Sequence, residues 1–432
     1  MGLKPGYKRT EVGVIPADWV LAQLGALTEK VGSGVTPTGG SRVYKAFGRP
    51  FMRSQNVGWG HLDLDDVAFI DDATHGSFKA TEIRAGDVFL NITGASIGRS
   101  AIADPRVEGG NVNQHVCIIR TNKDKLTSGF LCSFLISSRG QHQIDSFQAG
   151  GNRQGLNFGQ VRSFRIAVPT VIEEQRAIAT ALSDVDALLE ELDRLIAKKR
   201  DLKQAAMQQL LTGQTRLPGF EEGWGTRGLY EIAEHQKTLF DDGDWVEAEH
   251  ITDNGIRLVQ TGNIGVGQFV EKASRKYIYE SSFKQLKCKE LKIGDILICR
   301  LADPAGRVCV LPDIGDERVI TSVDVTIFRP SQEVADRNFF AQYFSTRDWF
   351  KKVLDQVGGT THKRISRGAL GQLEVPFPAL SEQRAIANVL SDMDAEIETL
   401  EQRRAKTAAL KQAMMQELLT GRTRLVTPQA AA

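Results

Sequence analysis

The chain has 432 residues, of which 41% are hydrophobic and 25% charged, with a formal net charge of +1, a composition typical of a globular protein of about three domains. No apolar run approaches the roughly 20 residues of a membrane span, and the N-terminal segment MGLKPGYKRTEVG contains no apolar signal-peptide region. The five cysteines have no metal-ligand spacing and lie in apolar runs, so we expect reduced core residues in a cytoplasmic protein.

Charge is distributed unevenly along the chain. Residues 1–172 carry 19 basic and 14 acidic side chains, whereas residues 218–380 carry 21 basic and 24 acidic ones. A basic first part permits contact with nucleic acid, but the second part gives no such support. Composition alone therefore leaves nucleic-acid binding open.

Residues 1–170 are predicted to form a first globular unit of strands and short helices. The unit opens on the pattern W-x4-L-x2-L, which begins at Trp19. Short apolar runs bounded by Gly or Asp predict strands, and a polar glycine loop, QAGGNRQGLN, precedes the last of them. The predicted strands cover 50–57, 67–70, 87–93, 115–120 and 165–169, and a short helix covers 130–138.

Residues 171–217 are predicted to form one long helix. Apolar residues recur at alternating steps of four and three, as in a coiled-coil seam. The seam residues are Ile178, Leu182, Val185, Leu189, Leu192 and Ile196, after which the pattern shifts to Leu195, Leu202, Ala206 and Leu210. The segment Leu-Leu-Thr-Gly ends the helix, with Gly213 suited to a left-handed conformation. A helix of about 38 residues, at roughly 1.5 Å each, is about 57 Å long.

Residues 218–380 repeat the order of the first unit loosely, and residues 381–425 repeat the helix closely. The segments Glu173–Leu217 and Ser381–Leu425 align without a gap, and about 28 of the 45 positions are identical. The second seam is formed by Ile386, Leu390, Met393, Ile397 and Leu400, and this helix also ends at Leu-Leu-Thr-Gly, with Gly421. Residues 426–432 are predicted to form a disordered tail.

The duplication indicates how the helices pack. One apolar stripe is explained about equally well by packing on its own domain, but two matched stripes can be buried against each other. A chain that runs out along one helix and back along the other favours an antiparallel pair. We therefore predict an α+β fold with a pseudo-two-fold internal repeat. It comprises two globular mixed α/β domains separated by two long antiparallel coiled-coil helices.

The usual enzyme signatures are absent from the sequence. There is no G-x-x-x-x-G-K-[ST], no H-E-x-x-H, no paired C-x-x-C, no G-x-S-x-G and no Asn- or Asp-Pro-Pro-aromatic tetrapeptide. Glu290-Leu291-Lys292 has the form E-x-K, but no preceding Pro-Asp supports a nuclease site. We therefore expect no catalytic residues and no metal site in this chain.

Polar loops in equivalent places of the two globular units are the candidate functional residues. Arg, Asn and Gln can contact base edges of DNA, and Lys, Arg, Ser and Thr can bind phosphates, although Asn, Thr and Gly also simply form turns. In the first unit the candidates are Arg53, Ser54, Asn56, Thr93, Ser96, Arg99, Asn113, Gln114, Asn152, Arg153, Gln154 and Asn157. In the second they are Gln260, Thr261, Asn263, Arg300, Arg307, Thr360, Thr361, His362, Lys363 and Arg364.

The arrangement of two variable globular units, each followed by a near-identical helix, resembles the specificity subunit of type I restriction–modification systems. The specific marks are P-x4-EQRAIA (Pro169–Ala179), P-x3-EQRAIA (Pro378–Ala387), the Leu-Leu-Thr-Gly helix ends and the W-x4-L openings. The resemblance covers residues 8–425. Because recognition units diverge in this family, it transfers no base-contacting residue.

The resemblance implies a function for each part. Residues 1–170 and 218–380 would be target-recognition domains, each specific for one half of a split double-stranded DNA sequence. Helices 171–217 and 381–425 would pack antiparallel and set the spacer between the half-sites. Two methyltransferase subunits, which bind S-adenosylmethionine and methylate adenine N6, would join this chain. Motor–nuclease subunits, which use ATP and Mg²⁺, would cleave unmodified DNA.

Two other classes of function stay open at this point. A structural coiled-coil adaptor, whose globular units bind proteins rather than DNA, fits the acidic second unit equally well. An enzyme such as a nuclease is the third possibility, and it would depend on Glu290 and Lys292. Salt-dependent DNA binding in the presence of methyltransferase subunits would distinguish the first two classes.

Overall fold

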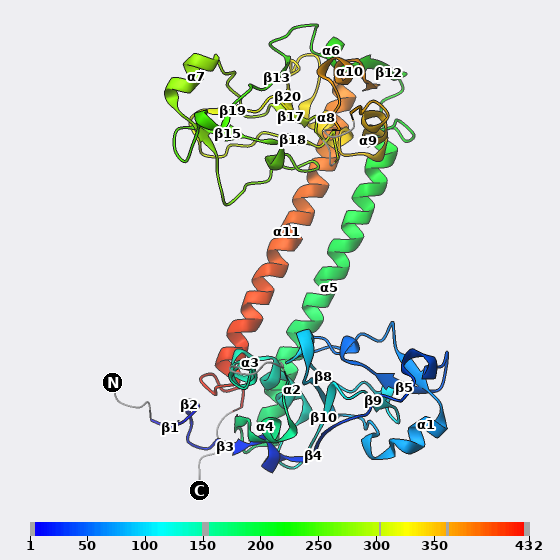
Figure 1. The fold of residues 1–432 in the computed structure, drawn as a ribbon, viewed down its shortest axis with the longest axis vertical. Helices are drawn as coiled ribbons and strands as arrows, with labels where there is room; N and C mark the ends of the chain where they lie inside the picture. The colour runs from blue at the N-terminus through cyan, green and yellow to red at the C-terminus, as the bar shows by residue number, and fades with distance from the viewer. Residues whose placement is uncertain (1–4, 149–154, 302–303, 360–362, 427–432) are drawn as a thin grey trace. The chain divides into compact units, whose positions relative to one another are not determined.

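A computed structural model describes residues 5–148, 155–301, 304–359 and 363–426 of the chain. The chain divides into two compact units, of which the first combines residues 1–193 with 402–432 and the second comprises residues 194–401. Each unit contains one globular part and one half of each long helix (Figure 1). The units therefore cut across the predicted domain boundaries, because both ends of the sequence contribute to the first unit.

The first globular part has a central four-stranded antiparallel sheet in the order β4-β10-β7-β8. These strands are β4 (Thr28–Ser33), β10 (Val116–Thr121), β7 (Val88–Asn91) and β8 (Ser100–Ile102). Around it lie the hairpin of β1 (Tyr7–Thr10) and β2 (Gly13–Pro16), the pair β3 (Val20–Gln23) and β11 (Arg165–Val168), and the sheet of β6 (Ala68–Ile70), β5 (Arg49–Met52) and β9 (Asn111–Val112). The helices are α1 (Asp72–Ser77), α2 (Ser128–Ile136), α3 (Ser138–Ser146) and α4 (Phe158–Ser163).

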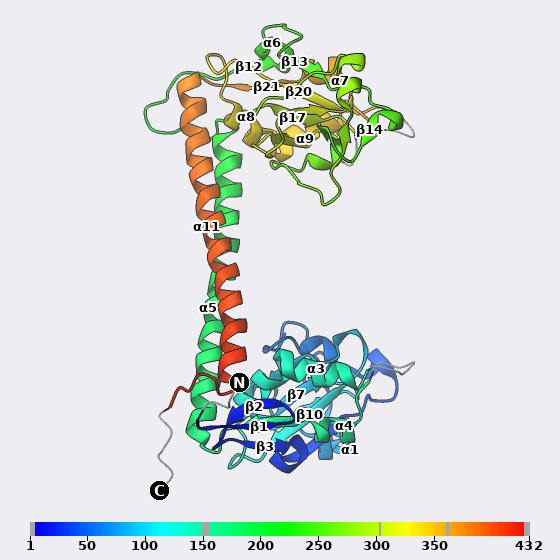
Figure 2. The ribbon, with the colours of Figure 1, turned by 90° about the vertical axis from the view of Figure 1, so that its left-hand side faces the viewer.

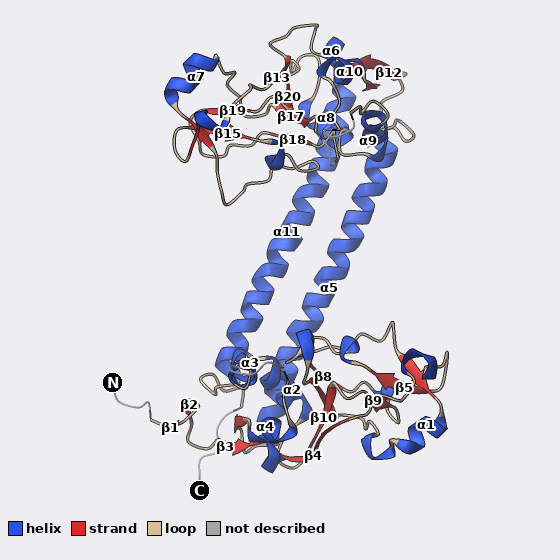
Figure 3. Cartoon of the chain, viewed as in Figure 1, coloured by secondary structure: helices blue, strands red, loops and turns tan. Residues whose placement is uncertain are grey.

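The second globular part repeats this scaffold, with a sheet in the equivalent order β13-β20-β17-β18. Its strands are β13 (Phe240–Asp242), β20 (Val325–Phe328), β17 (Ile296–Cys299) and β18 (Val308–Val310). Further strands are the pair β12 (Gly225–Gly228) and β21 (Glu374–Phe377), and the sheet of β14 (Ile251–Thr252), β16 (Tyr277–Ile278), β15 (Ile256–Val259) and β19 (Val319–Thr321). The helices are α6 (Leu229–Ile232), α7 (Glu280–Leu286), α8 (Arg337–Tyr343), α9 (Arg347–Leu354) and α10 (Arg367–Gln372) (Figure 3).

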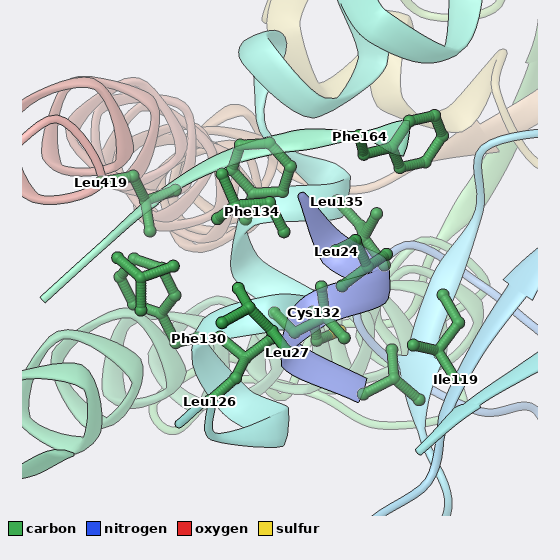
Figure 4. Close-up of a cluster of buried hydrophobic side chains, with 14 of the residues drawn as sticks. Leu24, Leu27, Ile119, Leu126, Phe130, Cys132, Phe134, Leu135, Phe164 and Leu419 are labelled. Atoms are coloured by element: carbon green, nitrogen blue, oxygen red, sulfur yellow. The ribbon is translucent and has the colours of Figure 1, made fainter. Parts of the chain in front are cut away.

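The predicted α+β class is confirmed, and the predicted strands and short helix correspond to β5, β6, β7, β10, β11 and α2. The core of the first unit packs α2 between the sheet and the long helices (Figure 4). Phe130 and Leu135 of α2 are fully buried there. Leu419, which follows the second long helix, is buried in the same core. The C-terminal part of the chain thus helps to fold its N-terminal domain.

The long helices are α5 (Ile172–Leu210) and α11 (Leu380–Leu418), each of 39 residues. In each unit they lie side by side (Figures 1 and 2). Of the predicted seam residues, Ile178, Leu182, Leu192, Ile196, Ile386, Leu390 and Ile397 are buried, and Val185, Leu189, Met393 and Leu400 are partly buried. Near the helix starts the seam is shared with the globular core, since Ile178 and Ile386 belong to the two main hydrophobic clusters.

Ion pairs between the helices show that they run antiparallel in both units. In the first unit Asp186 pairs with Lys411 and Asp193 with Arg404, each at 2.5 Å. In the second unit Lys199 pairs with Glu396 and Lys203 with Asp394, each at 2.6 Å. Residue numbers rise along one helix as they fall along the other, which confirms the predicted antiparallel arrangement within each unit.

The shifted stripe predicted after Ile196 is only partly buried. Leu210 is 7% exposed, but Leu202 is 48% exposed. The predicted interior position of Leu202 is therefore wrong. The reason is that Lys199 and Lys203 point toward α11 and pair with carboxylates there, so Leu202 lies on an outer face.

The two helix-terminating glycines adopt the predicted left-handed conformation. Gly213 has φ of 71° and Gly421 has φ of 67°. A Cβ atom at Gly421 would lie 2.4 Å from Pro16 Cγ, which is a collision, and one at Gly213 would make a tight contact of 3.2 Å with Trp224 Cε3. Backbone conformation therefore favours glycine at both positions, and packing requires it at Gly421.

Just past each glycine, an arginine binds the glutamate at the start of the other long helix. In the second unit Arg216 donates two hydrogen bonds to Glu382, at 2.6 and 2.7 Å, and Trp224 Nε1 donates a third at 2.9 Å. In the first unit Arg424 donates to Glu174 and to Asp18. Glu174 and Glu382 are both 1% exposed. We call these two arrangements the clasps; each joins the end of one long helix to the beginning of the other.

The glutamine that follows each clasp glutamate anchors the helix start to the globular part. Gln175 accepts from the backbone N–H of Thr127 at 2.8 Å, and Gln383 accepts from that of Asp336 at 2.8 Å. Each side chain also donates to the carbonyl of the proline that directly follows the preceding strand. The repeated Glu-Gln pair therefore has a structural role at both places.

Replacing Arg216 by alanine is expected to destabilise the second unit by about 3–5 kcal/mol, because it leaves the buried carboxylate of Glu382 without a cation. Arg200→Ala is the matched control, since Arg200 and Glu401 form an exposed pair whose loss costs about 0–1 kcal/mol. Urea unfolding followed by tryptophan fluorescence measures both. Equal effects of the two substitutions would contradict the importance of the clasp.

The first clasp is expected to weaken in acid. The hydrogen bond from Arg424 is the main cause that holds the pKa of Asp18 below its usual value of 3.8. Because the folded-state pKa is depressed, this contribution to stability is present above the unfolded pKa and is lost as the pH falls through the folded one. As the pH falls from about 5 to 3, the unfolding free energy of the first unit should decrease less steeply in Asp18→Asn than in the unaltered chain. Identical pH dependence of the two proteins would argue against the pairing.

Candidate nucleic-acid interface

The candidate loops of the first unit come together at one end of β7 and β10. Asn91, at the end of β7, donates its side-chain amide to the Ser54 carbonyl at 2.8 Å. The backbone of Ile92 bonds to His115 and to Leu156, at 3.0 and 2.8 Å. Thr93 Oγ1 lies 2.6 Å from His115 Nδ1. Segments 53–56, 91–100, 113–115 and 155–157, which we call the first loop edge, therefore form one contiguous surface.

The second unit brings its candidate loops together in the same way. Thr321 Oγ1 donates to the Val259 carbonyl at 2.8 Å, and Arg307 donates to the Thr261 carbonyl at 3.4 Å. The backbone N–H of Ile365 bonds to the Arg300 carbonyl at 3.1 Å. Segments 259–263, 299–301, 304–307, 321–324 and 363–365 form the second loop edge.

Both loop edges contain the same tight turn, which is held by a buried asparagine. Asn56 accepts from the backbone N–H of Arg53, and Asn263 accepts from that of Gln260, each at 3.0 Å. The two asparagines are 1% and 5% exposed and donate to further carbonyls of their loops. Asn56 and Asn263 therefore shape the turns, in which the candidates Arg53, Ser54, Gln260 and Thr261 are partly exposed.

The candidate arginines differ in how far they are engaged by the protein. Arg300 is 5% exposed and binds Asp242 at 3.1 Å and two backbone carbonyls, so it supports the edge from inside. Arg53 binds Asp66 at 3.0 Å, and Arg307 binds backbone carbonyls. Arg364 is exposed and lies 3.8 Å from Asp324. Burial raises the pKa of Asp242, which shows how far this carboxyl is removed from water.

The remaining candidates are mostly near the surface. Gln114, Asn157 and Lys363 are exposed, Ser96, Arg99 and Thr261 are partly exposed, and Asn113 is 8% exposed. Asn157 also caps α4 by accepting from the backbone N–H of Gln160. Asn152, Arg153, Gln154, Thr360, Thr361 and His362 lie outside the described residues. Contact with DNA stays a prediction for the whole set.

Several residues that organise the edges escaped the sequence analysis. Asn91 and His115 connect the loops of the first edge, and Asp242 balances Arg300 in the second. Behind the edges, buried Asp87 binds Arg120 at 2.7 Å, and Asp295 binds Arg329 in the equivalent place. The shared Gly-Asp in the aligned segments 82–102 and 290–310 was the signal that could have found the last two pairs.

The described residues also bear on other chemistries. Within them, no group of three or more His, Cys, Asp or Glu side chains could hold a metal ion. All five cysteines are buried and unpaired, and burial raises the pKa of the Cys117, Cys132 and Cys309 thiols to about 12. In the part of the chain that the structure describes, no helix is long and apolar enough to cross a membrane.

Comparison with known families matches residues 43–198 and 221–408 to the family described as the type I restriction modification DNA specificity domain. The chain belongs to this DNA specificity family. Each match covers most of one globular part and much of the helix that follows it. As a member of this family, the chain is a type I restriction–modification DNA specificity subunit.

Individual specificity subunits resemble the chain along its whole length. A provisional type I restriction enzyme specificity subunit, MjaX of Methanocaldococcus jannaschii, is 25% identical over 441 residues, which cover 98% of this chain and 97% of that protein. A structure described as the basis of complex assembly and conformational transition of the type I R-M system has a TM-score of 0.59 and 19% identity, covering 95% of this chain and 99% of that one.

The crystal structure of the HsdS subunit from Thermoanaerobacter tengcongensis has a TM-score of 0.50 and 20% identity, covering 95% of this chain and 98% of that one. These two structural likenesses show the fold, whereas the family match carries the assignment as a specificity subunit. The order of globular part, helix, globular part and helix is thus the order expected from the resemblance.

Two substitutions in the first loop edge should separate folding from recognition. Asn56→Ala is expected to cost about 1–3 kcal/mol of unfolding free energy, because it leaves buried backbone groups unpaired. Gln114→Ala, at an exposed position, should leave stability within about 0.5 kcal/mol and weaken binding to the specific DNA. Calorimetry and DNA titration of the assembled complex measure the two effects. Loss of stability in Gln114→Ala would place it among the structural residues.

Proposed function

We propose that each globular part recognises one half of a split DNA target and that the helix pair fixes the spacing between the halves. The observation that carries this proposal is the duplication itself. The two loop edges share one strand order and one buried asparagine turn, but their outward residues differ. A single chain with two such edges can recognise two different half-sites, which an identical homodimer cannot do.

The differences lie where base recognition would need them. The turn of the first edge carries Arg53 and Ser54, and the turn of the second carries Gln260 and Thr261. Arginine favours guanine and glutamine favours adenine in bidentate contacts, so the two turns would offer DNA different hydrogen-bonding groups once Arg53 exchanges Asp66 for a base. The helices, in contrast, are nearly identical, as expected of parts with one fixed role.

Helix length supports the spacer role. A continuous α-helix of 39 residues is about 58 Å long, which corresponds to roughly 17 base pairs at about 3.4 Å each. Half-sites within about two turns of DNA are therefore within reach of such helices. The interhelical ion pairs keep the two helices in one register within each unit.

The partners proposed for this subunit supply the chemistry. Two methyltransferase subunits would bind S-adenosylmethionine and methylate adenine N6, and motor–nuclease subunits would use ATP and Mg²⁺ to cleave unmodified DNA. We propose that this chain is non-catalytic and acts in the cytoplasm. Its near-neutral charge suits this role if the partners provide much of the phosphate contact.

Lengthening both helices tests the spacer role. Seven residues inserted after Ala197 and after Ala405, which are equivalent exposed positions of α5 and α11, should lengthen each helix by about 10 Å with little rotation. The spacer in the methylated motif should grow by about three base pairs while both half-sites stay the same. Insertion into one helix alone should abolish methylation because the ion pairs lose register. A motif with its original spacer after the double insertion would refute the proposed role.

A further inference from the structure

One carboxylate holds two side chains of the turn in the first loop edge. Asp66 lies in the loop between β5 and β6, and its Oδ2 atom accepts from Arg53 Nη2 at 3.0 Å and from Gln55 Nε2 at 2.8 Å. The side chain of Asp66 is 76% exposed, whereas that of Arg53 is 20% exposed. A carboxylate at the surface therefore engages two side chains of the types that contact base edges of DNA.

This pairing leaves part of the Arg53 guanidinium group unsatisfied. Within the described residues, all hydrogen bonds of the group come from Nη2, which also donates to the Asp66 carbonyl at 2.8 Å, and buried Nε has no partner. The centroid of the Tyr44 ring lies 5.7 Å from Arg53 Cζ, within the range of a cation–π interaction. Guanine presents two adjacent acceptors, O6 and N7, and can engage Nη1 and Nη2 together. A matching base therefore offers Arg53 a second point of contact that Asp66 does not supply.

The second loop edge has the same turn but lacks this carboxylate. In both edges the side-chain amide of the turn asparagine donates to the carbonyl seven residues later, at 3.1 Å in the first and 2.9 Å in the second. Counted from these bonds, Asp66 corresponds to Ala273, just as Arg53 corresponds to Gln260. The alanine side chain accepts no hydrogen bond, so Gln260 is not held in this way. The acidic contact is a feature of the first edge.

A carboxylate at this place opposes DNA binding in two ways. It repels the phosphates, and its hydrogen bonds must be given up before Arg53 or Gln55 can contact a base. A matching half-site replaces those hydrogen bonds with its own acceptors. Another sequence does not replace them, so there the exchange leaves donors unpaired and the repulsion uncompensated. The contact therefore weakens binding to wrong sequences more than binding to the right one.

We propose that Asp66 is a specificity-determining residue of the first unit, which competes with DNA for Arg53 and Gln55. Only a half-site whose bases replace the hydrogen bonds of the carboxylate is then bound tightly. Asp66 acts through these two side chains and contacts no base itself. This inference rests on the proposed function, which places DNA at the first loop edge. Since the second edge lacks the carboxylate, the effect is limited to the half-site that the first unit recognises.

DNA titrations of the assembled methyltransferase complex test the proposal. Three duplexes are compared: one with the intact split motif found by methylation sequencing, and two in which one half-site or the other is scrambled. In Asp66→Ala, the affinity for one of the scrambled duplexes should rise about fivefold, as expected from losing an exposed ion pair at the upper end of its range. The affinity for the intact motif should change less than about twofold. Discrimination at the other half-site should stay the same.

Asp65→Ala is the matched control for charge. Asp65 is exposed, directly precedes Asp66, and within the described residues its carboxylate forms no ion pair or hydrogen bond. The substitution removes an equal charge without releasing Arg53 or Gln55, so discrimination should stay that of the unaltered complex. In Asp66→Ala the backbone carbonyl that accepts from Asn56 at 2.9 Å is retained, so the turn should keep its fold. Unchanged thermal unfolding of both variants verifies that a change in discrimination is local.

The outcomes separate this inference from the function on which it rests. Unchanged discrimination in Asp66→Ala would overturn the role of Asp66 and leave the specificity function intact. An equal loss of discrimination in Asp65→Ala would also overturn it, because charge alone would then explain the effect. Relaxed discrimination at both half-sites would refute a role limited to the first unit. Failure of the unaltered complex to bind the motif with salt-dependent affinity would instead contradict the proposed function.

Discussion

The buried pairing of arginine with glutamate at the two clasps is the interaction on which the architecture depends. Arg216 with Glu382, and Arg424 with Glu174, fasten the end of each long helix to the start of the other. A glutamate that is 1% exposed is costly to keep charged unless it is fully paired, so each clasp tolerates little variation. Hydrogen bonds from Arg424 to Asp18 and Glu174 raise the pKa of its guanidinium despite the opposing effect of burial, which keeps it ionised.

The clasps make each compact unit a product of distant parts of the chain. The first unit needs the N-terminal domain, the first half of α5 and the last part of α11, and Tyr7 bonds to the Gly421 carbonyl at 2.9 Å. Each globular part is thereby packed against the helix segments of its own unit.

The sequence predicted the helices and the repeat well because both depend on local periodicity and identity. It predicted five of the eleven described strands of the first unit, β5, β6, β7, β10 and β11, from short apolar runs for the same reason. It could not predict the clasps, since Arg424 and Glu174 are 250 residues apart and their pairing depends on the tertiary fold. The periodic pattern placed Leu202 in a buried stripe. Periodicity alone does not show that Lys199 and Lys203 occupy the face toward α11. Asn56 was grouped with the other loop candidates, because the composition of a loop does not reveal whether an asparagine in its turn is buried.

Sequencing of adenine methylation in the host genome, with and without this gene, tests the central claim most directly. Two recognition domains joined by a helix pair of fixed length predict a motif of two unlike half-sites with a constant spacer, and this motif should disappear when the gene is deleted. A motif that persists after deletion, or one that is continuous rather than split, would contradict the account.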